Sequence, residues 1–92
     1  MNLREEIADK ARQNTKFDIN KFQKYLKDCF EHNSYTSVTI NFDGHSLYSC
    51  GKWIECPVPY KQDVINFISA NGFSYDKSMT MHKTEQIIVR IF

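Results

Sequence analysis

The sequence predicts a single α+β domain with the element order α-α-β-β-α-β-β and a four-stranded, mainly antiparallel sheet. Two stretches that alternate apolar and polar residues, 36–50 and 73–92, predict β-hairpins. Three stretches with apolar residues at helical spacing predict helices, of which the second and third pack on one face of the sheet. The chain has 92 residues, enough for one core, so the domain spans 1–92.

The first predicted helix runs from about residue 3 to residue 13. Asn2 can cap this helix, with Glu5 at the N3 position as in a capping box. The apolar stripe of the helix is narrow and its charged residues are mixed in sign. We therefore expect 1–14 to be a peripheral helix with a largely solvated surface.

The second predicted helix follows the N-cap Asp18 and ends near His32. Phe17 and Phe22 flank the start of the helix at the spacing of a hydrophobic staple. One face of the helix is apolar and includes Cys29, whereas the other face carries lysines. Together with a lysine just before the helix, they could form a basic ridge that contacts phosphates: Lys16, Lys21, Lys24 and Lys27. The acidic residues Asp28 and Glu31 reduce the positive charge of this ridge.

The dipeptide Asp43-Gly44 predicts the turn of the first hairpin, because a type I′ turn needs positive φ at both central residues. Such a turn fixes which side chains face the core and which face water. The predicted cross-strand pairs are Val38–Ser49, Ile40–Leu47 and Phe42–His45 on the buried face, and Thr39–Tyr48 and Asn41–Ser46 on the solvent face. Gly51 then predicts a bulge or a close backbone approach.

Two prolines between Lys52 and Tyr60 predict an extended connection that cannot join the interior of a sheet. The third helix is expected to begin near Pro59 and to end at Asn71-Gly72 in a left-handed cap. The final hairpin should turn within 82–85. Because its last strand is apolar on both faces, we place that strand centrally, although at an edge it could pair with a second copy to form a homodimer.

The composition bounds the function classes. The chain has 12 basic and 11 acidic residues, a net charge of +1, so no global field attracts nucleic acid or anionic lipid. No apolar run has the length of a signal peptide or of a membrane span, which predicts a cytoplasmic protein without a membrane partner. Three cysteines, an odd number, predict reduced thiols rather than a disulfide framework.

The sequence contains no pattern that predicts catalysis. Cys50, Cys56 and His45, with His32 or His82, form the one cluster with suitable zinc ligands, but their spacing matches no compact zinc motif. The cysteine of the second helix lies at the helix C-terminus, where the dipole does not lower its pKa. We predict no metal, no cofactor and no enzyme activity, and keep a thiol- or metal-dependent enzyme as the third alternative.

Aromatic and basic side chains gather around the first hairpin and the loop that follows it: Tyr48, Lys52, Trp53 and Tyr60. Such a mixture suits a hot spot for protein contact or a platform for base stacking. The region after the hairpin has too little basic excess for nucleic acid. We therefore predict a non-catalytic protein-binding surface, and the alternative is a small nucleic-acid or nucleotide binder that uses the lysine ridge.

The run F-I-S-A-N-G-F-S-Y, followed by the terminal I-I-V-R-I-F, resembles the ending of many small accessory proteins encoded by phages and mobile elements of AT-rich bacteria. The resemblance covers about the last third of the chain and carries over no functional residue. Some proteins of this sort, anti-CRISPR proteins included, inhibit host defence or replication enzymes by docking on them. The resemblance therefore implies an inhibitor or adaptor whose partner is a bacterial host protein.

Overall fold

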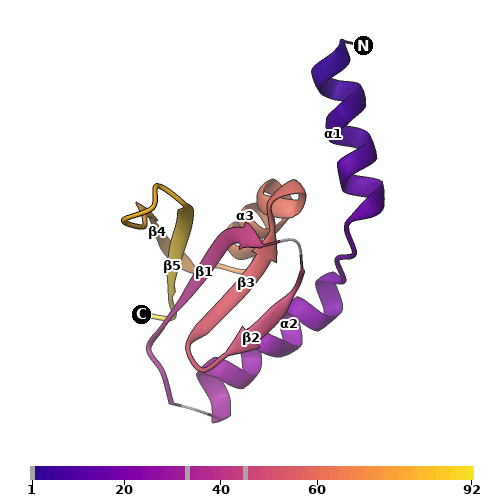
Figure 1. Ribbon diagram of the computed structural model, residues 1–92. Coiled ribbons are helices and arrows are strands. Elements are labelled where there is room, and N and C mark those ends of the chain that lie inside the picture. The colour runs from indigo at the N-terminus through magenta and orange to yellow at the C-terminus, as the bar shows by residue number, and fades with distance from the viewer. Residues whose placement is uncertain (1, 33, 45) are drawn as a thin grey trace.

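In the computed structural model, the chain folds into three α-helices and a five-stranded mixed sheet, and the structure describes residues 2–32, 34–44 and 46–92 (Figure 1). The helices are α1 (Leu3–Asn14), α2 (Ile19–Lys27), continued by the π-helical turn η1 (Asp28–His32), and α3 (Lys61–Ala70), preceded by the 3-10 turn η2 (Val58–Tyr60). The strands are β1 (Ser37–Gly44), β2 (Tyr48–Cys50), β3 (Trp53–Pro57), β4 (Ser74–Met79) and β5 (Glu85–Arg90).

The strand order in the sheet is β2-β3-β1-β5-β4. The central strand β1 runs parallel to β3, and the other neighbouring pairs are antiparallel. The predicted α+β class is confirmed. The predicted number of strands is wrong, because the sheet has five strands and not four. The prediction also did not include the parallel pair of β1 and β3.

The predicted turn at Asp43-Gly44 is also wrong. β1 continues to Gly44, whose φ is not positive, so no type I′ turn forms there. Continuation gives Ile40 an isoleucine on each side, Ile54 in β3 and Ile87 in β5. Two β-branched neighbours stabilise this strand more than a single hairpin partner would.

The hairpin in this part of the chain joins β2 to β3 instead. Its two-residue turn is Gly51-Lys52, and Cys50 pairs directly with Trp53. Gly51 has a φ of 58°, a left-handed conformation at the first turn position that favours glycine. Gly51 is therefore a turn residue and not a bulge, and the predicted pairs of β1 with residues 46–49 do not form; the pair that includes His45 lies outside the described residues.

The run expected to be an extended connection is the internal strand β3. Ile54 and Cys56 point into the core, and Trp53 and Glu55 alternate with them on the opposite side. Pro57 stands at the last position of the strand, opposite Gly44 and beyond a shift in register. A proline at a strand end removes little of the hydrogen-bond ladder, and so the strand tolerates it.

The predicted helix starts are confirmed. The side chain of Asn2 accepts a hydrogen bond from the backbone N–H of Glu5 at 2.9 Å, and Asp18 caps α2 in a similar way. The rings of Phe17 and Phe22 lie 6.3 Å apart between centroids, as a staple across the helix start requires.

The predicted end of α3 and the final hairpin are confirmed as well. Gly72 has a φ of 80°, and the N–H of Phe73 donates to the carbonyl of Ile68 at 3.2 Å, a Schellman cap. The hairpin turns over residues 80–84, slightly earlier than expected. β5 lies between β1 and β4, inside the sheet, so it offers no free edge to a second copy.

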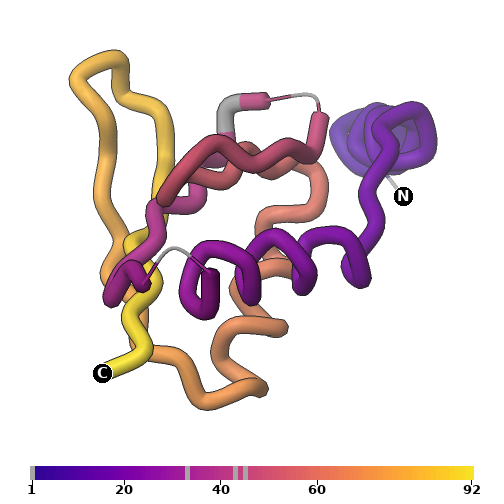
Figure 2. The backbone as a smooth tube through the Cα atoms, turned by 90° about the horizontal axis from the view of Figure 1, so that it is seen from below, coloured from indigo at the N-terminus to yellow at the C-terminus, as the bar shows by residue number. Residues whose placement is uncertain are grey.

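Helices α2 and α3 cover one face of the sheet (Figure 2). The core between these layers contains the buried apolar side chains Phe22, Leu26, Cys29, Val38, Ile40, Phe42, Ile54, Cys56, Val64, Ile65, Ile68, Ile87 and Val89, with Leu47 half-buried against them. No residue of α1 is buried, and this helix projects from the body, as its predicted peripheral position requires. None of the helices in the described ranges is long and apolar enough to cross a membrane.

Candidate functional site

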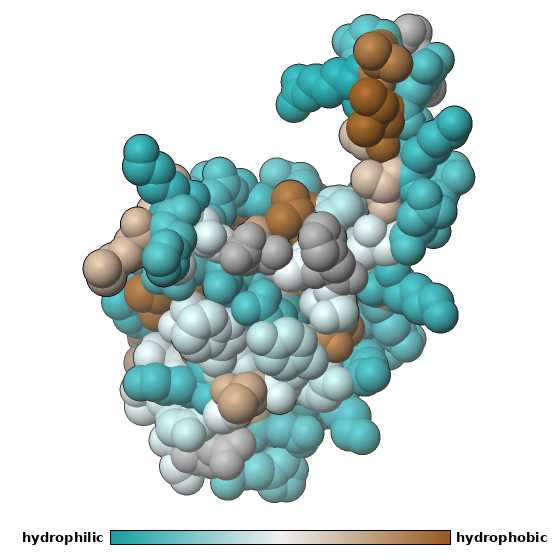
Figure 3. All heavy atoms as spheres, viewed as in Figure 1, coloured by the Kyte–Doolittle hydropathy of each residue, from teal (hydrophilic) through white to brown (hydrophobic). Residues whose placement is uncertain are grey.

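The face of the sheet opposite α2 and α3, here called the outer face, carries two rows of side chains that cross all five strands. From β2 to β4, the first row is Tyr48, Glu55, Asn41, Gln86 and Ser78, and the second row is Cys50, Trp53, Thr39, Ile88 and Asp76. Neighbours within a row face each other directly, with Cβ atoms about 5 Å apart. In Figure 3, side chains of intermediate hydropathy gather over β1, β3 and β2, with hydrophilic ones around them.

Two of the predicted contact residues, Tyr48 and Trp53, form an exposed aromatic pair on this face. Tyr48 is 47% exposed and Trp53 is 44% exposed, and they occupy diagonal positions on neighbouring strands. Desolvation, then the negative charge of Glu55 and then a hydrogen bond to the Glu55 side chain raise the pKa of Tyr48, so its hydroxyl stays protonated at neutral pH. Lys52 lies beside Trp53 in the exposed turn, and its carbonyl accepts from the N–H of Thr39 at 2.9 Å.

Tyr60, the fourth predicted contact residue, lies elsewhere. It follows the far end of β3, where its ring stacks on Phe17 at 4.7 Å between centroids. Its hydroxyl donates to the carbonyl of Arg12 at 2.9 Å, and the Arg12 guanidinium lies 4.6 Å from the ring centre. Tyr60 therefore attaches α1 to the body and does not contribute to the outer face.

At the centre of the outer face lies a buried polar pair that the sequence reasoning missed. Asn41 is only 5% exposed and Glu55 only 9% exposed. The Asn41 amide donates to Oε1 of Glu55 across a long 3.5 Å, which is a weak hydrogen bond. The other two oxygens, Asn41 Oδ1 and Glu55 Oε2, are buried and have no hydrogen-bond partner among the described residues.

This buried pair destabilises the folded domain. A buried polar atom without a partner costs about 1–3 kcal/mol, and a charged one costs more. None of the ion pairs found in the described ranges includes Glu55. The carboxylate thus lies at the centre of an uncovered sheet without a cation beside it.

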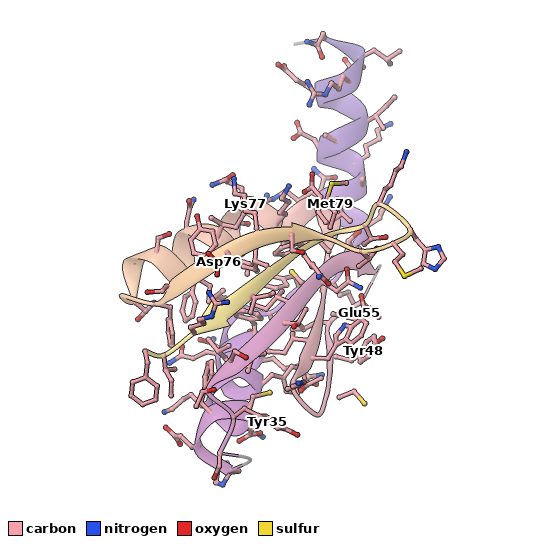
Figure 4. All side chains as sticks on the ribbon, turned by 90° about the vertical axis from the view of Figure 1, so that its left-hand side faces the viewer. Tyr35, Tyr48, Glu55, Asp76, Lys77 and Met79 are labelled. Carbon is pink, nitrogen blue, oxygen red and sulfur yellow. The ribbon has the colours of Figure 1, made fainter. Side chains whose placement is uncertain are left out.

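Local structure explains how the carboxylate fits there. The register of β1 against β3 shifts between Asn41 and Gly44. A Cβ atom on Gly44 would stand 2.9 Å from Glu55 Oε2, so a larger residue there would force the end of the Glu55 side chain to shift. Figure 4 shows Glu55 and Tyr48 side by side on the same side of the sheet. The alternation of Trp53 and Glu55 with apolar residues was the available sequence signal, but the prolines that follow argued against a strand.

The four lysines of the alternative site are all exposed, but they do not form one strip. Two of them line a hollow beside Phe17 and Leu47, and the other two line a second hollow that also contains Asp28 and Glu31; in chain order they are Lys16, Lys21, Lys24 and Lys27. Carboxylates therefore accompany the second pair. This arrangement weakens the predicted phosphate-binding ridge.

The three cysteines are free thiols. Cys29 and Cys56 are buried in the core, and Cys50 is exposed. Burial raises the pKa of Cys29 and raises that of Cys56 to about 12, so neither forms a thiolate at neutral pH. Within the described ranges, no group of three His, Cys, Asp or Glu side chains could hold a metal ion; His45 lies outside these ranges.

The outer face thus combines half-exposed aromatic side chains with a central carboxylate, which can bind a ligand through stacking, hydrogen bonds and charge. The neutral hydroxyl of Tyr48 and the buried thiols offer no activated nucleophile. No family model, curated protein or solved structure matches this chain.

Proposed function

We propose that this chain is a non-catalytic binding domain whose outer face docks on another protein. The observation that carries this proposal is a sheet face without a covering helix, on which half-exposed Trp53 and Tyr48 flank a buried carboxylate that forms no ion pair with any described residue. Tryptophan and tyrosine are enriched at interface hot spots, because they bury a large area for few rotatable bonds. A partner that covers this face would remove both rings from water.

A protein fits the outer face better than a nucleic acid does. Glu55 places negative charge at the centre of the face, where it would repel phosphates. Arg90, at the far side of the same face, is already paired with Asp76. The single positive charge of Lys52 is too small to bind a phosphate backbone when Glu55 repels it.

The resemblance of the last third of the chain to phage and mobile-element accessory proteins supports a more specific form of the proposal. In that form, the partner is a bacterial host protein, such as a defence or replication enzyme, and this chain acts in the cytoplasm as a stoichiometric inhibitor or adaptor. Its small size fits such a role, as do the raised pKa values of Cys29 and Cys56, which keep these two thiols protonated. A homodimer is a separate possibility, which a measurement of mass in solution would test.

The test is a quantitative binding comparison. A partner captured from a bacterial lysate would be purified, and its affinity for the wild-type chain measured by calorimetry. We expect Trp53→Ala and Tyr48→Ala each to weaken binding about 10- to 30-fold, because truncating a hot-spot aromatic costs about 1.4–2 kcal/mol. Circular dichroism should show both variants folded, because neither side chain belongs to the core.

Met81→Ala is the matched control. Met81 is 99% exposed in the β4–β5 turn, away from the two rows of the outer face, so its truncation should leave the affinity unchanged. If folded Trp53→Ala and Tyr48→Ala proteins bind the partner as tightly as the wild type, the outer face is not the docking surface.

A second candidate function is the binding of a nucleic acid or nucleotide by the lysines of α2 and the segment before it. The observation in its favour is that Lys16 and Lys21 are exposed and line the same hollow. Asp18 lines that hollow too and reduces its positive potential. We rank this function second for that reason.

A further inference from the structure

We infer that the outer face recognises a cationic side chain of its partner, an ammonium or guanidinium group, through Glu55 and Asn41. The inference rests on the proposed docking function and specifies its chemistry. It starts from two side chains that are more than nine-tenths buried and yet have an oxygen each without a partner. A buried polar atom without a partner in the free protein is typical of a site that another molecule completes.

The chemistry of the unpaired atoms selects the ligand. Asn41 Oδ1 and Glu55 Oε2 are both hydrogen-bond acceptors, so the site needs donors. A carboxylate also favours a positive charge, and a charge-assisted hydrogen bond is about twice as strong as a neutral one. An ammonium or a guanidinium group supplies several donors and the charge together, whereas an anion supplies neither.

The described neighbours supply only part of these donors. Gln86 faces Asn41 from β5, but its amide nitrogen donates to Ser78 Oγ at 3.4 Å. Tyr48 faces Glu55 from β2, and its hydroxyl donates its single proton to the Glu55 side chain. One neutral donor does not balance the charge of the carboxylate, and it leaves Asn41 Oδ1 without a donor. Gly44 has no side chain to donate, and even a Cβ atom at this position would stand only 2.9 Å from Oε2.

A cation can reach the carboxylate from the edge of the sheet. Tyr48 belongs to β2, an edge strand of three residues, and is 47% exposed. A cation that approaches from this edge would have to displace the Tyr48 hydroxyl from the Glu55 side chain. The face of the ring would then be available to a bound cation, which aromatic rings attract.

The first test measures the stability of the free protein with Glu55→Gln. The amide is close in shape to the carboxylate, removes the buried charge, and brings an N–H that can donate to Asn41 Oδ1. We expect the melting temperature to rise by about 4 °C or more, since about 1 kcal/mol shifts a domain of this size by that amount. If the melting temperature falls or stays the same, the carboxylate has a structural role in the free protein and the inference is wrong.

The second test titrates the ¹⁵N-labelled protein with N-acetyl-arginine methylamide and follows the side-chain amide of Asn41 and the indole of Trp53 by NMR. We expect saturable shifts at millimolar probe for the wild type, and none for Glu55→Gln. The uncharged citrulline counterpart of the probe should give no shifts. Absence of a saturable shift at Asn41 in the wild type, or equal shifts in Glu55→Gln, would overturn the inference.

Asp76→Asn is the matched control, because Asp76 is a carboxylate on the same face that Arg90 already pairs. It should bind the arginine probe like the wild type.

The two proposals fail in different ways. If Trp53→Ala weakens partner binding but the arginine probe does not bind, only the inference of a cation site is wrong. If the probe binds but Trp53→Ala and Tyr48→Ala leave the affinity for the partner unchanged, the proposed docking function is wrong.

Discussion

Cys56 illustrates how burial determines the chemistry of a single side chain in this protein. It lies on the core side of β3 with no exposed surface. Burial, and then the charges of Asp63 and Glu55, raise its pKa from 9.0 to about 12. A thiol that stays protonated at neutral pH is neither a nucleophile nor a metal ligand, so Cys56 takes no part in thiol chemistry at that pH.

The same shift predicts a loss of stability in alkali. In the unfolded chain Cys56 ionises near pH 9.0, whereas in the folded protein it holds its proton to about pH 12. The stabilisation is therefore complete below pH 9.0 and is lost as the pH rises from there through about pH 12, by up to about 1.4 kcal/mol per pH unit. Urea unfolding at a series of pH values measures this slope.

Cys56→Val is the control for this prediction, because valine fills a similar volume and does not ionise. The slope of unfolding free energy against pH should be smaller in the variant. The raised pKa of Tyr48 acts in the same direction at higher pH and remains in both proteins. Identical slopes for the variant and the wild type would show that Cys56 is not the group that titrates.

Single residues were predictable where their role is local. Asn2 and Asp18 cap helices, and Gly72 ends one, through contacts with residues at most a few positions away. Asp43-Gly44 has an equally strong local signal, but the strand partners of Ile40 come from distant parts of the chain. Pairing with these partners outweighs the turn preference, and a local pattern does not contain that information.

At the scale of elements, α1 is held to the body by its C-terminal end. Arg12 pairs with Asp63 and donates to the carbonyl of Pro59 at 3.3 Å, and Tyr60 bonds back to Arg12. The apolar side chains Leu3 and Ile7 near its start are exposed. In Figure 3, hydrophobic residues appear in brown on the projecting helix. A helix of 12 residues with so few tertiary contacts is marginally stable in water.

We therefore expect α1 to open independently of the sheet. In hydrogen exchange followed by NMR, its amides should exchange about 100-fold or more faster than those of β1, because local opening costs far less than global unfolding. Tyr60→Phe, which removes the hydroxyl bonds to Arg12 and Thr15, should speed exchange in α1 and leave β1 unchanged. Equal protection of α1 and β1 in the wild type would contradict this expectation.

Among the elements, the helices and the final hairpin were predictable, and β3 was not. The helices have caps and an apolar period of their own, and the last hairpin joins strands next to each other in the chain. β3 carries the alternation of a strand, but its pairing partner β1 is not its neighbour in sequence. Two prolines at the end of the run then favoured a loop, because local rules do not show that Pro57 falls where pairing ends.

At the scale of the whole molecule, the distribution of charge favours protein binding over nucleic-acid binding. Basic and acidic residues nearly balance, and the lysines near α2 are distributed between two hollows. The outer face has a carboxylate at its centre. We expect fluorescence anisotropy to detect no binding of a duplex oligonucleotide at physiological salt, about 0.15 M.

The double variant Lys21→Ala/Lys24→Ala is the check on this prediction, and it should behave like the wild type. If the wild type binds the duplex and the variant does not, the lysine site is the functional one. Contacts from all four lysines would then lower the logarithm of the affinity with a slope of about −3.6 against the logarithm of salt concentration.

The candidate site was predictable only in part, because some of its residues come together only through pairing between strands that are distant in the sequence. Tyr48 and Trp53 could be chosen from residue type and nearness in sequence, and both lie on the outer face. Asn41 and Glu55 become neighbours only through the parallel pairing of β1 with β3. Sequence reasoning without that register left Glu55 isolated, so the predicted site contained the basic Lys52 but no acidic residue.

The insertion of β3 between β1 and β2 also affects how the chain reaches this state. β1 is the first strand in the sequence and the middle one in the sheet, and Ile40 meets Ile54 on one side and Ile87 on the other. Both neighbours come from later in the chain, so two loops must close before the middle strand is complete. Domains dominated by such distant pairings refold in about milliseconds to seconds rather than microseconds. The centre of the sheet is therefore expected to assemble last, after the helices and the two hairpins.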